Sequence, residues 1–150
     1  MSELKDGIQA GIRESLKSGD KVRLSTLRLL SAAVKNREIE VLRELDDDEV
    51  REVAVKEAKR RKEAIEAYEV GGRLELADKE KAELELLQVY LPEQLSEAEV
   101  DALIEEAVAL TGASSMKEMG KVMGAVMAKA KGKADGTQIQ AKVRARLSGE

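Results

Sequence analysis

Cysteine and histidine are both absent from the 150-residue chain. Their absence excludes disulfide bonds, thiol nucleophiles and imidazole acid-base catalysis, and it removes the usual zinc ligands. Any chemistry must therefore use carboxylates, lysines, hydroxyls or an active site supplied by a partner. We expect no metal, no cofactor and no catalytic residue of the chain's own.

Aromatic residues are almost missing, because the chain has no Trp or Phe and only Tyr68 and Tyr90. Both tyrosines fall at apolar helical positions, so the core must consist of Leu, Val, Ile, Met and Ala. Platforms on which unpaired bases could stack are therefore not expected. If RNA binds, the shape of its backbone should matter more than the identity of its bases.

Long apolar runs are missing too. No stretch reaches the roughly 18 residues that a membrane-spanning helix needs, and the N-terminus has no secretory signal pattern. We therefore expect a cytoplasmic protein with no membrane partner.

Apolar residues recur at helical spacing throughout, and no run alternates long enough to predict a strand. This pattern predicts an all-α protein, with a four-helix unit of helical hairpins at residues 1–93 and a three-helix tail domain at 96–148. The single proline, Pro92, lies in the expected boundary near residues 91–96. The first four helices should cover about 2–18, a long segment from 20, 47–70 and 73–91.

Helix boundaries can be assigned from capping residues. Ser96 with Glu99, and Ser115 with Glu118, have the spacing of capping boxes, and Asp135 can cap the last helix. We expect Leu4, Ile8, Ile12 and Leu16 to line one face of the first helix. The last helix should direct Ile139, Val143 and Leu147 inward.

The segment from Met116 to Lys131 predicts a helix with two contrasting faces. Its apolar face comprises Met116, Met119, Val122, Met123, Val126, Met127 and Ala130. Its other face comprises Lys117, Lys121, Gly124, Ala128 and Lys131. A glycine inside a helix costs about 1 kcal/mol relative to alanine, so Gly124 needs a reason. Either phosphates approach the bare surface between the lysines, or another helix packs closely there.

Charge is unevenly distributed in the tail. Residues 96–111 hold five carboxylates and no base, whereas 112–150 hold eight Lys or Arg against three acids. The overall net charge of -4 argues against a nucleic-acid binder, but this local distribution favours one. Such blocks also arise by chance in a chain with 37% charged residues.

Three further groups of polar residues have simpler interpretations. The basic segment 59–62 could contact phosphates as a second patch, but its four side chains project in different directions. Arg61 falls on the apolar stripe, and we expect it to pair with Glu57 one turn earlier. The acids at 46–49 could hold a divalent ion, but helix capping explains them with fewer assumptions. Ser115 near Lys117 superficially matches serine-lysine acylation chemistry, and capping again suffices.

The tail segment also resembles a known family. Gly120-Lys-x-Met-Gly124, followed by Lys129-x-Lys-Gly-Lys-Ala-Asp135, is similar to the tail domain of the B subunit of the tRNA-dependent amidotransferase and to the YqeY-like proteins. The segments 81–87, 90–97 and 113–120 are YqeY-like as well, so the resemblance covers nearly the whole chain.

This resemblance implies a tRNA-binding module in the context of a carbon-nitrogen ligase that uses glutamine as amido donor. No part of the ATP-dependent cradle or of an amidase has a counterpart here, so whether the chain is an enzyme stays open. Expected partners are tRNA and components of aminoacyl-tRNA synthetases or the amidotransferase, but not DNA. The expected RNA-binding residues are Lys117, Lys121, Gly124, Ala128, Lys129, Lys131, Gly132, Lys133 and Asp135. The alternative is an adaptor that docks a partner protein on the Gly124 and Ala128 face.

Overall fold

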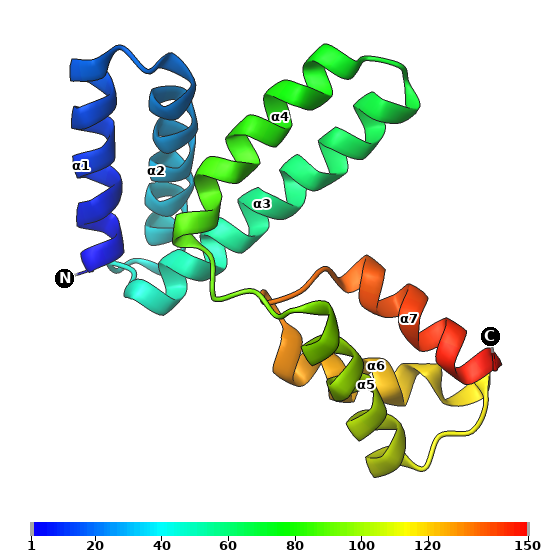
Figure 1. Ribbon diagram of the computed structural model, residues 1–150. Coiled ribbons are helices and arrows are strands. Elements are labelled where there is room, and N and C mark those ends of the chain that lie inside the picture. Colours follow the sequence, from blue (N-terminus) through cyan, green and yellow to red (C-terminus); the bar gives the residue numbers. More distant parts are fainter. Residues whose placement is uncertain (1, 150) are drawn as a thin grey trace. The chain divides into compact units, whose positions relative to one another are not determined.

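The computed structural model describes residues 2–149, and in this range the chain forms helices and no strand. This confirms the expected all-α fold (Figure 1). The chain divides into two compact units, Met1–Leu91 and Pro92–Glu150. The elements are α1 (Glu3–Ser18), α2 (Lys21–Val41), α3 (Asp47–Val70), α4 (Leu74–Leu87), η1 (Gln88–Tyr90), α5 (Glu97–Thr111), η2 (Met116–Glu118), α6 (Met119–Ala130) and α7 (Gly136–Ser148).

The first unit consists of two helical hairpins, α1 with α2 and α3 with α4 (Figure 1). Gly19, at a φ of 76°, ends α1, and the Asp20 carboxylate caps α2 by accepting a hydrogen bond from the Arg23 N–H. Short glycine-containing turns of this kind bring consecutive helices side by side. The shared core includes Ile8, Leu27, Leu30, Val34, Val50 and Leu87.

Helices α1 and α2 approach closely at Gly11. A Cβ atom at this position would lie 2.7 Å from Cδ1 of the buried Leu27. The Ser15 hydroxyl, also buried, donates to the Gly11 carbonyl oxygen at 2.7 Å. Small residues on α1 therefore set the separation of this hairpin, a role that the four-residue apolar pattern did not reveal.

Two predictions for the first unit were wrong. Leu16 is 55% exposed, because a four-residue spacing rotates by about 40° at each step and carries the fourth residue off the buried face. The fourth helix ends at Leu87 rather than 91, and η1 follows it. Leu91 is extended before Pro92, as the steric clash with the proline ring requires.

Arg61 is buried as predicted, but its expected partner was wrong. Its guanidinium pairs with Glu83 at 3.0 Å and Glu80 at 3.4 Å, both on α4. Glu57 pairs instead with the exposed Arg60 at 3.4 Å. The contact between α3 and α4 brings carboxylates of another helix to Arg61, which sequence spacing along one helix cannot show.

The second unit packs α5, α6 and α7 around an aliphatic core (Figure 1). Ser96 and Glu99 form the predicted capping box, and Gly112 ends α5 with a φ of 67°. Asp135 caps α7 as predicted. The buried side chains include Val100, Ile104, Val122, Val126, Ile139, Val143 and Leu147.

The predicted start of the sixth helix was wrong in detail. Ser115 makes no side-chain capping hydrogen bond, and the residues after it form the 3-10 turn η2 before α6 begins at Met119. The Glu118 carboxylate accepts from the Ser114 N–H at 3.3 Å instead. A 3-10 turn has fewer residues per turn than an α-helix, which shifts the phase of Met116 and leaves it 40% exposed.

Candidate nucleic-acid interface

Four exposed lysines lie on η2, on α6 and in the turn after α6, and we call this surface the basic strip. It consists of Lys117, Lys121, Lys131 and Lys133, with Gly124 and Ala128 between them, and all six are exposed. No atom lies within 4 Å of where a Cβ would stand on Gly124. Within residues 2–149, the surface between the lysines is therefore bare and uncovered.

Three of the other four cations of the second unit are held by the acids of α5; the exception, Arg144, is exposed and has no carboxylate within 4.0 Å in the described part of the chain. Lys129 pairs with Glu106 at 2.7 Å, and Arg146 pairs with Glu105 at 2.6 Å. Lys142 bridges two further carboxylates, those of Glu97 and Asp101, at 3.0 and 2.8 Å. These pairs join α5 to α6 and α7 across the surface.

The pKa directions agree with this pairing. Hydrogen bonds to Asp101 and then to Glu97 raise the pKa of Lys142. The hydrogen bond to Glu105 raises the pKa of Arg146 in the same way. Since Glu99 serves the capping box, each of the five α5 acids is occupied.

The four lysines of the basic strip have no such partner. In the described part of the chain, no carboxylate lies within 4.0 Å of Lys117, Lys121, Lys131 or Lys133. Lysines without an ion pair can neutralise phosphates without first breaking an internal contact. The acids of α5 therefore neutralise one set of cations in the tail, and the lysines of the basic strip stay free in the described chain.

The turn between α6 and α7 is held in a defined conformation. Gly132 has a φ of 76°, a conformation that favours glycine. Its carbonyl oxygen accepts from Gln94 Nε2 at 2.9 Å. The Lys133 carbonyl oxygen accepts from the Leu95 N–H at 2.7 Å. These bonds fix the backbone of the turn while the Lys133 side chain stays exposed.

Two of the expected RNA-binding residues have structural roles instead of free side chains. Lys129 lies off the basic strip, in its ion pair with Glu106. The Asp135 carboxylate accepts from the Thr137 N–H at 2.9 Å and caps α7. The remaining seven expected residues lie on α6, on η2 or in the turn.

Gly120 was placed in the family motif but was not included among the expected RNA-binding residues. It lies one turn before Gly124, it is exposed, and a Cβ there would also meet no atom within 4 Å. The four-residue spacing to Gly124 was the available signal. Gly120, Gly124 and Ala128 together make the low surface of the strip longer than predicted.

The acids at 46–49 and the expected absence of a membrane span can also be compared with the structure of residues 2–149. Asp46 and Glu49 form a capping box at the start of α3, and Asp47 accepts hydrogen bonds from the Ser2 hydroxyl and the Leu4 N–H. These contacts confirm capping of α3 by Asp46 and Glu49, whereas Asp47 contacts the start of α1 and Asp48 pairs with Arg51 at 3.1 Å. Among the helices of residues 2–149, none combines the length and apolar character needed to cross a bilayer.

Comparison with known proteins gives several fungal relatives. A Lachancea thermotolerans protein named "Altered inheritance of mitochondria protein 41, mitochondrial" is 29% identical over 100 residues, which are 65% of this chain and 54% of that protein. A protein of the same name from Eremothecium gossypii is 29% identical over 114 residues, 71% of this chain and 62% of that protein. An uncharacterized Schizosaccharomyces pombe protein is 34% identical over 93 residues, 59% of this chain and 76% of that protein.

The chain thus spans between half and two thirds of the two proteins named for mitochondrial inheritance. Residues 5–147 match the family described as Yqey-like protein, which is almost the entire sequence. The chain therefore belongs to the YqeY-like family.

Proposed function

We propose that the chain is an RNA-binding module whose basic strip contacts the phosphate backbone of tRNA. The observation that carries the proposal is the contrast between two sets of cations. The α5 acids neutralise Lys129, Lys142 and Arg146, whereas the lysines around Gly124 stay unpaired and exposed in the described chain.

The chemistry of the strip suits a sugar-phosphate edge. Lysines supply point charges to phosphates, and a surface without long side chains lets the RNA backbone come near α6. Tyr90 is buried and Tyr68 is half-buried, so neither offers an open ring for base stacking. We therefore expect recognition of folded RNA by shape, with little dependence on base sequence.

The family resemblance supplies the wider context of the proposal. We infer that the module presents tRNA to synthetase or amidotransferase components, and that any glutamine-dependent amide transfer occurs on the partner. We also propose a cytoplasmic location. Since two relatives are named as mitochondrial proteins, fractionation of the source cell is the direct measurement for this part.

The decisive experiment measures tRNA binding by the full chain and by a K121A/K131A/K133A variant. Matched circular dichroism spectra would establish that both are folded, which we expect because all three side chains are exposed. The variant should bind at least tenfold more weakly. About three phosphate contacts should give a log-log salt slope between roughly -2 and -3, which the variant should lose. Equal affinities would refute the proposal.

A second candidate function is an adaptor that docks a partner helix on the same face. Gly120, Gly124 and Ala128 recur every four residues and are uncovered, which permits close helix packing. Affinity for such a partner should depend weakly on salt. Bulky substitution at Gly124 should abolish it, while removal of the three lysines should have little effect.

A further inference from the structure

A second apolar surface lies on α2, on the side opposite the core. Its positions alternate in steps of three and four residues, the spacing of a coiled-coil seam. Val22 is 42% exposed, Leu29 is 51% exposed and Ile39 is 70% exposed. We call this surface the α2 seam; its residues are Val22, Ser25, Leu29, Ala32, Asn36 and Ile39, all exposed.

Three cations border the α2 seam at intervals of seven residues. Lys21, Arg28 and Lys35 are exposed, and successive members lie about 10.5 Å apart along the helix axis. None of them has a carboxylate within 4.0 Å among residues 2–149. From Lys21 to Arg37 the helix contains no acid at all. Unit 1 thus leaves a row of positive charge unmatched beside an apolar surface.

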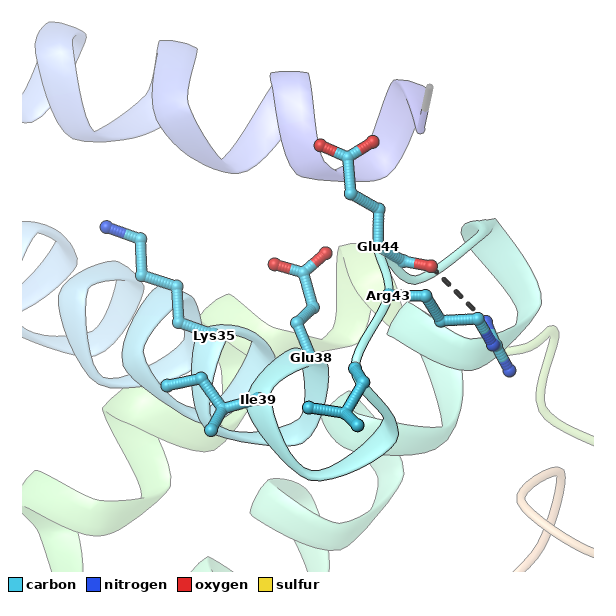
Figure 2. Close-up of a pocket in the computed structure, with 6 residues that line it drawn as sticks. Lys35, Glu38, Ile39, Arg43 and Glu44 are labelled. Atoms are coloured by element: carbon cyan, nitrogen blue, oxygen red, sulfur yellow. Dashed lines mark hydrogen bonds between the residues drawn. The ribbon is translucent and has the colours of Figure 1, made fainter.

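Shallow hollows mark both ends of this surface. One, of about 350 Å³, is lined by Lys21, Leu24, Ser25, Arg28 and Leu29. The other, of about 480 Å³, is lined by Lys35, Glu38, Ile39, Leu42, Arg43 and Glu44 (Figure 2). In the second hollow Glu38 points toward α1 (Figure 2), where its carboxylate binds Lys5 at 2.7 Å. The Glu38 carboxylate is thus paired with Lys5, and the charge of Lys35 makes a smaller contribution to its lowered pKa.

Leu42 adds an observation that the fold does not explain. It ends α2 in the left-handed conformation at a φ of 58°, where glycine is the usual residue. Its side chain is 89% exposed, so packing within the described chain does not compensate the strain. A strained, exposed leucine at the edge of an apolar hollow is consistent with a contact made outside this chain.

We propose that the α2 seam docks an amphipathic helix of a partner protein that carries carboxylates along its apolar face. Leucine-like side chains of that helix fill the spaces above Ser25 and Ala32, which are small, and its acids pair with Lys21, Arg28 and Lys35. Charge complementarity at seven-residue spacing sets the register, as it does in paired helices.

Other occupants fit the surface less well. Phosphates gain nothing from the exposed Leu29 and Ile39, so RNA would leave the apolar part unused. A second copy docked antiparallel through the same seam would bring the cations of both copies together, and a parallel copy would leave Lys21 and Arg28 opposite residues without an acid. A lipid surface would favour large or aromatic side chains, whereas this seam includes Ser25, Ala32 and Asn36.

The test uses a labelled amphipathic peptide of four heptads. Each heptad has Leu at its two apolar positions and Glu at the two positions that flank them, and the repulsion between these Glu residues opposes self-association of the peptide. The full chain should bind it with micromolar affinity. It should bind a matched peptide with Lys in place of Glu at least tenfold more weakly. A K21E/R28E/K35E variant should reverse this preference, and a K117E/K121E/K131E variant serves as the control that keeps it.

Three other results would overturn the proposal: binding to anionic phosphatidylserine vesicles, binding to RNA, or dimerisation of the chain. Each counts only if the K21E/R28E/K35E variant loses that binding or dimerisation, which would show that it uses the α2 seam. Failure to bind the acidic peptide would overturn the proposal as well. A photo-crosslinker placed at Leu29 in the host cell then identifies the occupant. Crosslinks should map to an acidic amphipathic helix, and a crosslinker at Glu63 of α3 should not give them.

Discussion

Arg61 and Glu83 form an ion pair at 3.0 Å between α3 and α4, with both side chains almost completely buried. Glu80 lies 3.4 Å from the same guanidinium, whose Nε atom has no hydrogen-bond partner. The guanidinium thus depends on carboxylates from the neighbouring helix to compensate its loss of hydration. Removal of Glu83 would leave the buried guanidinium with only the more distant Glu80 carboxylate, so its charge would be compensated incompletely.

We predict that E83A destabilises the protein by about 3 kcal/mol, measured by chemical denaturation. E57A is the matched control, because within residues 2–149 the ion-pair partner of Glu57 is the exposed Arg60. It should cost less than about 1 kcal/mol. An equal loss for the two variants would contradict the pairing of Arg61 with α4.

The free energy of unfolding should decrease as the pH is lowered, and Glu49 is one of the groups that set the pH range of this decrease. Hydrogen bonds from Arg43 and then from the Asp46 N–H lower the pKa of Glu49 from 4.5 to about 2. Because the folded-state pKa is the lower one, this stabilisation is complete above pH 4.5 and is lost as the pH falls toward 2.

The measurement compares melting temperatures of the native chain and an E49Q variant. The native chain should melt higher at pH 7, and the difference should shrink between pH 4.5 and 2. A difference that stays constant across this interval would show that the carboxylate charge is not responsible.

Substitutions of Gly124 should separate stability from binding. G124A should stabilise the protein by about 1 kcal/mol, because alanine is the better helix former and its Cβ meets no atom within 4 Å. G124L should keep the helix but weaken tRNA binding, since its side chain stands between the lysines. Thermal melts and tRNA titrations of both variants check this, and undiminished binding by G124L would count against the basic strip.

Replacement of Leu42 by glycine should have opposite effects on the stability of the protein and on its binding of the acidic peptide. L42G should raise the unfolding free energy by about 1 kcal/mol, because glycine adopts a positive φ without steric strain. The same change should weaken binding of the acidic peptide, since it removes an exposed apolar contact. If binding is unchanged, Leu42 is not part of the docking surface.

Substitution of Lys121 should reduce the affinity for tRNA more than substitution of Lys129. K121A removes a free charge of the basic strip, whereas K129A removes one already paired with Glu106. We expect several-fold weaker tRNA binding for K121A and a smaller change for K129A. Similar losses in the titrations would mean that RNA breaks the Glu106 pair.

Much of the local structure was predictable because it depends on neighbouring residues. Asp46 with Glu49, Ser96 with Glu99, and Asp135 cap helices within three residues of their own position. The failures concern longer range or different geometry. Ser115 was assigned a capping box, but η2 intervened, and Arg61 found its acids on another helix.

The candidate interface was predictable to a similar degree. Helical spacing alone predicted that Lys117, Lys121 and Lys131 are exposed, and the structure confirms their exposure. It could not show that Lys129 is occupied by Glu106, because that pair joins residues 23 positions apart.

The amino-acid sequence by itself determined that this protein is helical, where most helices begin and end, and which α6 side chains face outward. Those features follow from periodicity, caps and turns, which act over a few residues. Only the tertiary structure decided which charges are neutralised and which stay free, and among the residues it describes the apolar row on α2 stays exposed. Ion pairing and burial depend on distances between helices, and these distances are set by packing.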